Sequence, residues 1–228
     1  MPKVVDHEQR REELVRVVWE IISRDGIEAA TVRKVAEAAG VSVGGLRHYF
    51  DNQRGLLSFA AQAVARSVGN RISGHLLDAD LQGMQRAQLI LEELLPLDDN
   101  RRVEVDVWLA CLVRSHVDDS LAELRHAGWS GERHICRLAV ASCHGLPLPD
   151  RLEQELAEAR LEGQAMRLHV FIDGLTLQTA TYPHKFTPQV VHQIVHEELC
   201  CLIETADDGQ CGADPVALRV KQQSRLRR

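Results

Sequence analysis

The stretch Thr31–Phe50, which reads TVRKVAEAAGVSVGGLRHYF, predicts two short helices separated by a tight turn. Thr31 is a suitable N-cap for the first helix, since its hydroxyl can accept a hydrogen bond from a backbone N–H. Gly40 then ends this helix, because glycine adopts the left-handed conformation of a helix end at little cost. The apolar side of the first helix consists of Val32, Val35, Ala36 and Ala39.

The second helix begins after Ser42, another N-cap residue, and turns Leu46 and Phe50 toward the inside of the protein. Its outer side combines small residues, which allow a close approach to DNA, with donors for phosphates and base edges. That outer side consists of Val43, Gly44, Arg47 and His48, with Tyr49 at its edge. This arrangement predicts a helix-turn-helix whose second helix reads the major groove of DNA.

Two other interpretations compete for the same residues. An ordinary helical hairpin with a polar surface would need only part of this series of signals. The segment Gly40–Gly44 also matches the G-x-S-x-G turn that carries the nucleophile of many hydrolases. That turn requires a preceding strand, whereas an alanine-rich helix precedes it here, so we prefer the helix-turn-helix.

From about Arg10 to Ala60 the chain resembles the TetR family of one-component transcriptional regulators. The preceding helix has apolar residues at helical spacing and ends at Asp25-Gly26, and a fourth helix opens with Gly55-Leu56-Leu57. The ending RHYF, Arg47–Phe50, is most similar to the subgroup of choline-responsive BetI-type repressors. The apolar residues of the first helix are Leu14, Val17, Val18, Ile21 and Ile22.

The resemblance implies an all-α fold with a three-helix head and a helical-bundle body that binds a ligand and dimerises. We expect the head at residues 1–54, the body at 55–206 and a basic tail at 207–228. The family usually has a lysine that meets a phosphate at the position of Gln53, and here Arg54 is the adjacent base. The residues expected to contact DNA are Thr31, Arg33, Ser42, Val43, Gly44, Arg47, His48, Tyr49 and Arg54.

The net charge of −6 would by itself argue against a nucleic-acid partner, but the charge is uneven. Residues 31–54 carry four basic side chains against two acidic ones, so the expected DNA footprint is local. The tail beyond Asp214 adds five bases and no acid. No apolar run has the length of a signal peptide or a membrane span, so we expect a cytoplasmic protein without a membrane partner.

In the body, apolar periodicity predicts helices over 56–68, 83–95 and from 99 onward. Gly128-Trp129-Ser130 is expected to break the chain before a helix over 131–144, and Asp150 to open a helix running to about Thr181. A last helix follows Thr187 and Pro188. The final two helices are apolar enough to predict a two-fold dimer through Phe171, Leu175, Val191, Ile194, Val195 and Leu199.

A small-molecule effector is expected in the body. Trp108 offers an aromatic face to a cation, and Asp173 is a carboxylate in an otherwise apolar helix, which requires a partner. The alternatives are a core tryptophan and a structurally bonded carboxylate. The residues expected at the ligand are Trp108, Cys111, Leu112, Met166, Val170 and Asp173.

We therefore expect a dimeric regulator, most often a repressor in this family, that binds a near-palindromic operator under effector control. No cofactor, metal or catalytic residue is predicted, and the chain is not expected to be an enzyme. One alternative is a metal-dependent or enzymatic helical protein that uses the histidine-rich body, where His192, His196 and Cys200 share one helical face. Another is a helical adaptor without DNA binding.

Overall fold

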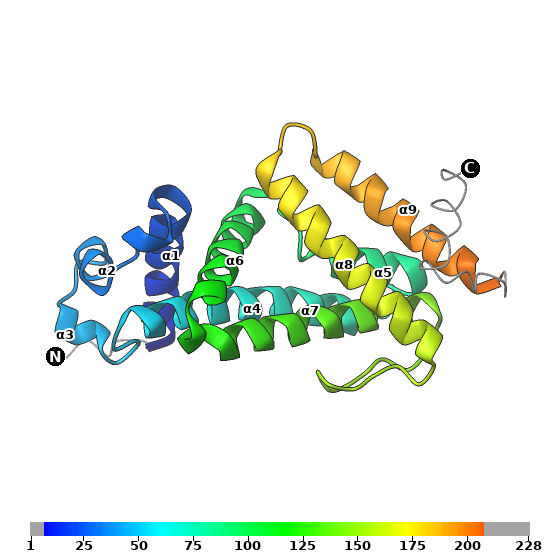
Figure 1. Cartoon of the computed structure of the whole chain (residues 1–228), viewed down its shortest axis with the longest axis horizontal. Coiled ribbons are helices and arrows are strands. Elements are labelled where there is room, and N and C mark those ends of the chain that lie inside the picture. The colour runs from blue at the N-terminus through cyan, green and yellow to red at the C-terminus, as the bar shows by residue number, and fades with distance from the viewer. Residues whose placement is uncertain (1–6, 208–228) are drawn as a thin grey trace, which may run out of the picture.

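The computed structural model describes residues 7–207, and within that range every regular element is helical. The predicted all-α fold is thereby confirmed. A head that contains α1 (His7–Asp25) and the short helices α2 (Val32–Ala38) and α3 (Val43–Leu46) lies at one end of the molecule, and the remaining helices form the body (Figure 1). The expected basic tail falls almost entirely outside the described residues.

The head begins with α1 (His7–Asp25) and continues through the 3-10 helix η1 (Ile27–Ala29), α2 (Val32–Ala38) and α3 (Val43–Leu46). Both predicted caps are present. Thr31 Oγ1 accepts a hydrogen bond from Lys34 N at 3.2 Å, and Ser42 Oγ accepts one from Gly45 N at 3.1 Å. Gly40 has φ +65°, the left-handed conformation expected at the end of α2.

The second helix of the motif is shorter than the sequence suggests. It is α-helical only over Val43–Leu46, and the chain then turns through Arg47 to Tyr49. Hydrogen bonds from Tyr49 N and Phe50 N to the Leu46 carbonyl extend this turn. Two consecutive glycines, Gly44 and Gly45, weaken the helix because they lose more backbone freedom on folding than other residues.

The body consists of α4 (Gln53–Leu77), α5 (Gly83–Glu92), α6 (Asp99–Val117), η2 (Asp119–Leu121), α7 (Ala122–Cys143), α8 (Ala159–Thr181) and α9 (Pro188–Asp207). One apolar core joins the head to α4 and to parts of α6 and α7. A second core lies among α5, α7, α8 and α9. Because α4 and α6 belong to the first core, a displacement of either helix would also move the head.

The expected break at Gly128-Trp129-Ser130 is wrong, because α7 runs without interruption from Ala122 to Cys143. Gly128 serves close packing instead. A Cβ atom at this position would lie 2.1 Å from Cη2 of Trp108 on α6. The glycine therefore lets the indole ring approach the backbone of α7.

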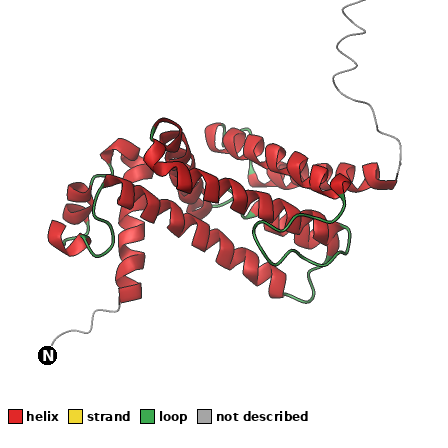
Figure 2. Cartoon of the chain, turned by 60° about the horizontal axis from the view of Figure 1, so that its bottom comes forward, coloured by secondary structure: helices red, strands yellow, loops and turns green. Residues whose placement is uncertain are grey.

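The expected helix start at Asp150 is also wrong, since α8 begins only at Ala159. The segment between α7 and α8 is an irregular loop (green in Figure 2). Side chains of the flanking helices form hydrogen bonds with the backbone of this loop. Arg137 on α7 donates to the Leu152 carbonyl at 3.1 Å, and Leu156 N donates to the carboxylate of Glu162 on α8 at 3.2 Å. Arg137 and Glu162 also form an ion pair with each other, at 2.7 Å.

Among residues 7–207, no helix is both long enough and apolar enough to cross a membrane.

Candidate functional site

The outer surface of the helix-turn-helix is open to solvent. Arg47 and His48 are exposed, as are Arg33 on α2 and Arg54 at the start of α4. Val43, at the first position of α3, is 45% exposed. Arg33 and Arg47 form no ion pair with any residue that the structure describes, so their charges are available to an external anion. Of the remaining residues expected at DNA, Thr31, Ser42 and Gly44 are exposed.

Some of these side chains also have structural roles. The hydroxyl oxygens of Thr31 and Ser42 cap the two helices, as described above. Tyr49 is half-buried, and its ring meets that of Phe59 edge-on at 6.5 Å between centroids. Lys34 is bound to Asp25 at 2.8 Å, which removes much of its charge from the surface.

Gln53 stands where the family usually has a lysine, and its role here is structural. Its Nε2 donates to the Ala30 carbonyl at 2.7 Å and thereby ties the start of α4 to the segment before α2. Arg54, the next residue, is exposed. Arg54 is therefore the exposed basic residue at the start of α4.

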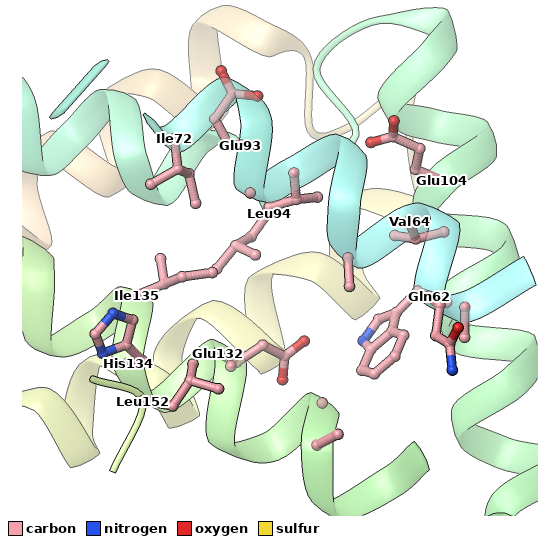
Figure 3. A pocket seen from close by; sticks show the side chains of 18 of the residues that line it. Gln62, Val64, Ile72, Glu93, Leu94, Glu104, Glu132, His134, Ile135 and Leu152 are labelled. Atoms are coloured by element: carbon pink, nitrogen blue, oxygen red, sulfur yellow. The ribbon is translucent and has the colours of Figure 1, made fainter. Parts of the chain in front are cut away.

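The body contains a cavity of about 500 Å³ between α4, α6 and α7, closed at one side by the end of α5. Its wall is mostly apolar, with contributions from Val64, Ile72, Leu94, Trp108, Ile135 and Leu138. Figure 3 shows Leu94 and Ile135 among the side chains that line this space. A volume of this size is within the range of small-molecule sites in proteins.

Of the residues predicted at the ligand, Trp108 alone lines this cavity. Cys111 lies one turn further along α6 and is fully buried in the core, where burial raises the pKa of its thiol to about 12. Met166, Val170 and Asp173 are exposed on α8 and Leu112 is half-buried on α6, and none of them reaches the cavity. The ligand residues predicted on α8 therefore lie outside this cavity.

Sequence reasoning missed the charged group beside the cavity. Arg71 on α4 donates to Glu93 at 2.5 Å and to Glu104 at 2.7 Å, and Glu93 and Glu104 both line the cavity. Burial lowers the pKa of Arg71, but hydrogen bonds and charges from Glu104 and Glu93 outweigh burial and raise it. The signal available in the sequence was the pair of glutamates at otherwise apolar helical positions.

Glu132 is a third carboxylate in the cavity wall, on α7. His169 Nε2 lies 3.3 Å from Glu132 Oε2 and 3.8 Å from Asp173 Oδ2. Burial and the nearby charge of Glu132 raise the pKa of Asp173. Within the described part of the chain, these three residues are the set that brings potential metal ligands together, with ligand atoms within 4.8 Å of one another.

The histidines of α9 do not converge on a metal position. His192 Nδ1 lies 2.7 Å from Glu92 Oε1, and His196 Nδ1 lies 3.2 Å from Gln88 Oε1. Cys200 contacts Met84 at 4.0 Å. This face of α9 therefore packs on α5 of the same chain, so the histidines do not support the alternative of a metal-dependent protein.

The predicted dimer residues divide into two groups. Val191, Val195 and Leu199 are fully buried in the core of the same chain, and Leu175 is buried with them. These four side chains are therefore not available to a partner. Phe171 and Ile194 are half-buried at the edge of the same core.

Two family models match the chain. Residues 14–59 match the bacterial regulatory proteins of the tetR family, and residues 83–203 match the C-terminal domain of BetI-type transcriptional repressors. Among curated proteins, the HTH-type transcriptional regulator PksA of Bacillus subtilis is 31% identical over 210 residues, which cover 91% of this chain and 97% of PksA.

Solved structures have the same fold. A transcriptional regulator from Rhodococcus sp. RHA1 superposes with a TM-score of 0.70 at 25% identity, covering 86% of this chain and 96% of that one. A protein from Saccharomonospora viridis, solved in complex with choline, superposes with a TM-score of 0.68 at 18% identity, covering 84% and 95%. The matching families and relatives are transcriptional regulators and not enzymes, as the sequence predicted.

Proposed function

Because the chain belongs to the TetR family of transcriptional regulators and has a helix-turn-helix DNA-binding domain, we propose that it acts as a homodimeric repressor released by a small molecule. Its operator would be near-palindromic. Two features of the same chain support this proposal most directly. Arg47 beside α3 is exposed and has no ion-pair partner among the described residues, and the body contains an apolar cavity.

The head would place α3 in the major groove, with Arg47 and His48 as donors to base edges and phosphates. Arg33 and Arg54 flank α3 and would contact phosphates, which set the position of a protein on the duplex. Two heads about 34–36 Å apart would meet successive turns of the groove on one side of the DNA.

Two helices that line the cavity, α4 and α6, also pack against the head, which supports effector control. α6 contributes Trp108 to the cavity and meets the head through Asp106, which accepts a hydrogen bond from Ser23 at 3.0 Å. Arg114, further along α6, pairs with Glu28 at 3.0 Å. Two positions of α6 would correspond to two spacings of the heads. An effector with a higher affinity for one of these positions would shift the equilibrium toward it, by no more than the difference in its two binding free energies.

DNA binding by the purified full-length chain tests the proposal. Fluorescence anisotropy with fragments tiled across the region upstream of its own gene should find one fragment bound much more tightly than the others. With three basic contacts per head, affinity for that fragment should fall by about 10³-fold between 50 and 200 mM salt. Uniformly weak binding to every fragment would favour the adaptor without DNA binding.

We propose that the dimer forms through the exposed sides of α8 and α9. Val170 and Leu177 on α8 are 66% and 54% exposed, and Val190 on α9 is 41% exposed. Gly174 lies between the first two, and a Cβ atom added to it would meet no other atom within 4 Å, so a partner helix could approach closely. The two helices lie at the edge of the molecule remote from the head (Figure 1).

Replacing Val170 by glutamate should raise the dimer dissociation constant by at least about tenfold, because it removes an apolar side chain that the dimer would bury and sets two like charges near the two-fold axis. Sedimentation equilibrium measures this change. Leu77→Glu is the matched control, since Leu77 is 85% exposed at the far end of α4. If Val170→Glu dimerises as tightly as the wild type, the interface lies elsewhere.

A further inference from the structure

The cavity wall contains three carboxylates, from Glu93, Glu104 and Glu132, which at first suggests a site for an organic cation. The three differ in what they already bind. Glu93 and Glu104 lie together at one edge of the cavity, and Glu132 lies on the opposite side (Figure 3). The difference between the two sides indicates the chemical class of effector.

Glu93 and Glu104 are already neutralised by the protein. Arg71 bonds to both, and Arg101 Nη1 lies 3.7 Å from Glu93. Burial raises the pKa of Glu93, but hydrogen bonds from His75 and Arg71 lower it more, so this carboxylate is held in its charged, paired form. Arg101 is itself bound to Asp98 at 2.7 Å, so Arg71 is the arginine that pairs closely with both glutamates. A carboxylate that is already paired attracts an external cation less strongly than an unpaired one.

Glu132 has no arginine partner within the described residues. The hydrogen-bond partner found for it is His169, at 3.3 Å, and its side chain remains 20% exposed. In Figure 3 its carboxylate points away from Ile135 and His134, toward the opposite side of the view. Glu132 is therefore the carboxylate in the wall with acceptor capacity left for a ligand.

His134 provides a second polar point in the same wall. Its Nδ1 is buried and has no hydrogen-bond partner among residues 7–207, and burial together with the charge of Arg137 lowers the pKa of the imidazole. A buried nitrogen without a partner costs free energy unless a ligand or water satisfies it. The remaining lining is predominantly apolar, and the volume equals roughly seventeen waters at liquid density.

We infer that the effector is a predominantly apolar molecule, larger than choline, with an amine or hydroxyl group that donates a hydrogen bond to Glu132. This inference rests on the proposed role of the cavity as the effector site. It departs from the choline found in the Saccharomonospora viridis protein, because the two other carboxylates are committed to Arg71.

The test uses the full-length protein and N-phenyl-1-naphthylamine, an uncharged fluorescent arylamine with one N–H donor. We expect saturable binding with enhanced fluorescence and no displacement by millimolar choline chloride. Glu132→Gln should weaken binding by about 5- to 15-fold, since hydrogen bonds to charged groups are stronger than neutral ones. Glu93→Gln should change it less than Glu132→Gln does.

Filling the cavity provides a second, independent measurement. Gly131 on α7 lines the cavity, and a side chain there would meet no atom within 4 Å at its Cβ. Gly131→Leu should therefore keep the fold and abolish probe binding. Gly74→Leu is the matched control, because Gly74 on α4 is equally unobstructed but lies outside the cavity.

Absence of probe binding, displacement by choline, or equal losses in Glu93→Gln and Glu132→Gln would each overturn the inference. Its failure is distinguishable from failure of the proposed regulation, because DNA binding is measured separately. If the protein binds the probe in the cavity but its affinity for the operator does not change, the inferred ligand class still holds and effector control is contradicted.

Discussion

Replacement of Arg71 by methionine is expected to lower the free energy of unfolding by about 3–5 kcal/mol, because removing one partner of a buried ion pair leaves uncompensated charges. Glu104 and Glu93, its two partners, are only 5% and 10% exposed at their side chains. Thermal unfolding should show the loss as a fall in Tm of about 6–20 °C for a chain of this length.

The loss of stability caused by Arg71→Met should depend on pH. In the wild type the pKa of Glu93 is lowered, so this carboxylate stabilises the fold above its unfolded pKa, and the contribution is lost as pH falls through the folded value. Without Arg71, burial is opposed by the hydrogen bond from His75 and the charge of Arg101 alone, so the folded pKa of Glu93 rises and the charged form stabilises the fold less. The difference in Tm should thus be largest near neutral pH and smaller near pH 5.

Two controls separate charge from lost packing. Adding Glu104→Gln to Arg71→Met should recover part of the stability, since it removes one of the unpaired charges. Arg24→Met removes an arginine that is 71% exposed and paired with Asp25 at the surface, and should leave Tm nearly unchanged. If Arg71→Met is as stable as the wild type, Arg71 does not stabilise the buried charges of Glu93 and Glu104.

The head could be predicted closely from the sequence because local chemistry determines it. The caps at Thr31 and Ser42 and the left-handed Gly40 each depend on residues a few positions away. Such signals survive in any tertiary context. Only the length of α3 was overestimated. The spacing of Leu46 and Phe50 predicted a longer helix, but Gly44 and Gly45 destabilise it.

The body was predicted less well because contacts between distant segments determine its details. Gly128 looked like a helix break, yet it gives room to Trp108, which is remote in sequence. The charged run after Asp150 looked helical, but Arg137 and Glu162 hold its backbone in a loop. Neither contact has a signature in the local sequence.

The cavity shows the same limitation in a functional setting. Trp108, predicted to contact a ligand, lies in its wall, whereas Glu132 was not predicted, because helical periodicity marks an apolar side without saying which neighbour covers it. The outer residues Met166 and Val170 were assigned to the ligand for that reason. Their exposure instead places them on the surface of α8.

Replacement of Arg47 by alanine should weaken operator binding by about 1–3 kcal/mol, or about 5- to 150-fold, with the fold intact. Arg47 is exposed beside α3 and unpaired within the described chain, so its loss leaves no buried partner. Fluorescence anisotropy measures the affinity and circular dichroism the fold. Arg151→Ala is the control, because Arg151 is 82% exposed on the loop between α7 and α8.

The same variant distinguishes a base contact from a phosphate contact. If Arg47 reads a base edge, affinity for the operator should fall while affinity for unrelated DNA stays nearly constant. If it binds a phosphate, both affinities should fall together, and the slope of log affinity against log salt should decrease by about one per head. Unchanged affinity for every fragment would show that Arg47 does not contact DNA, and His48, Arg33 and Arg54 would remain as the candidate basic contacts.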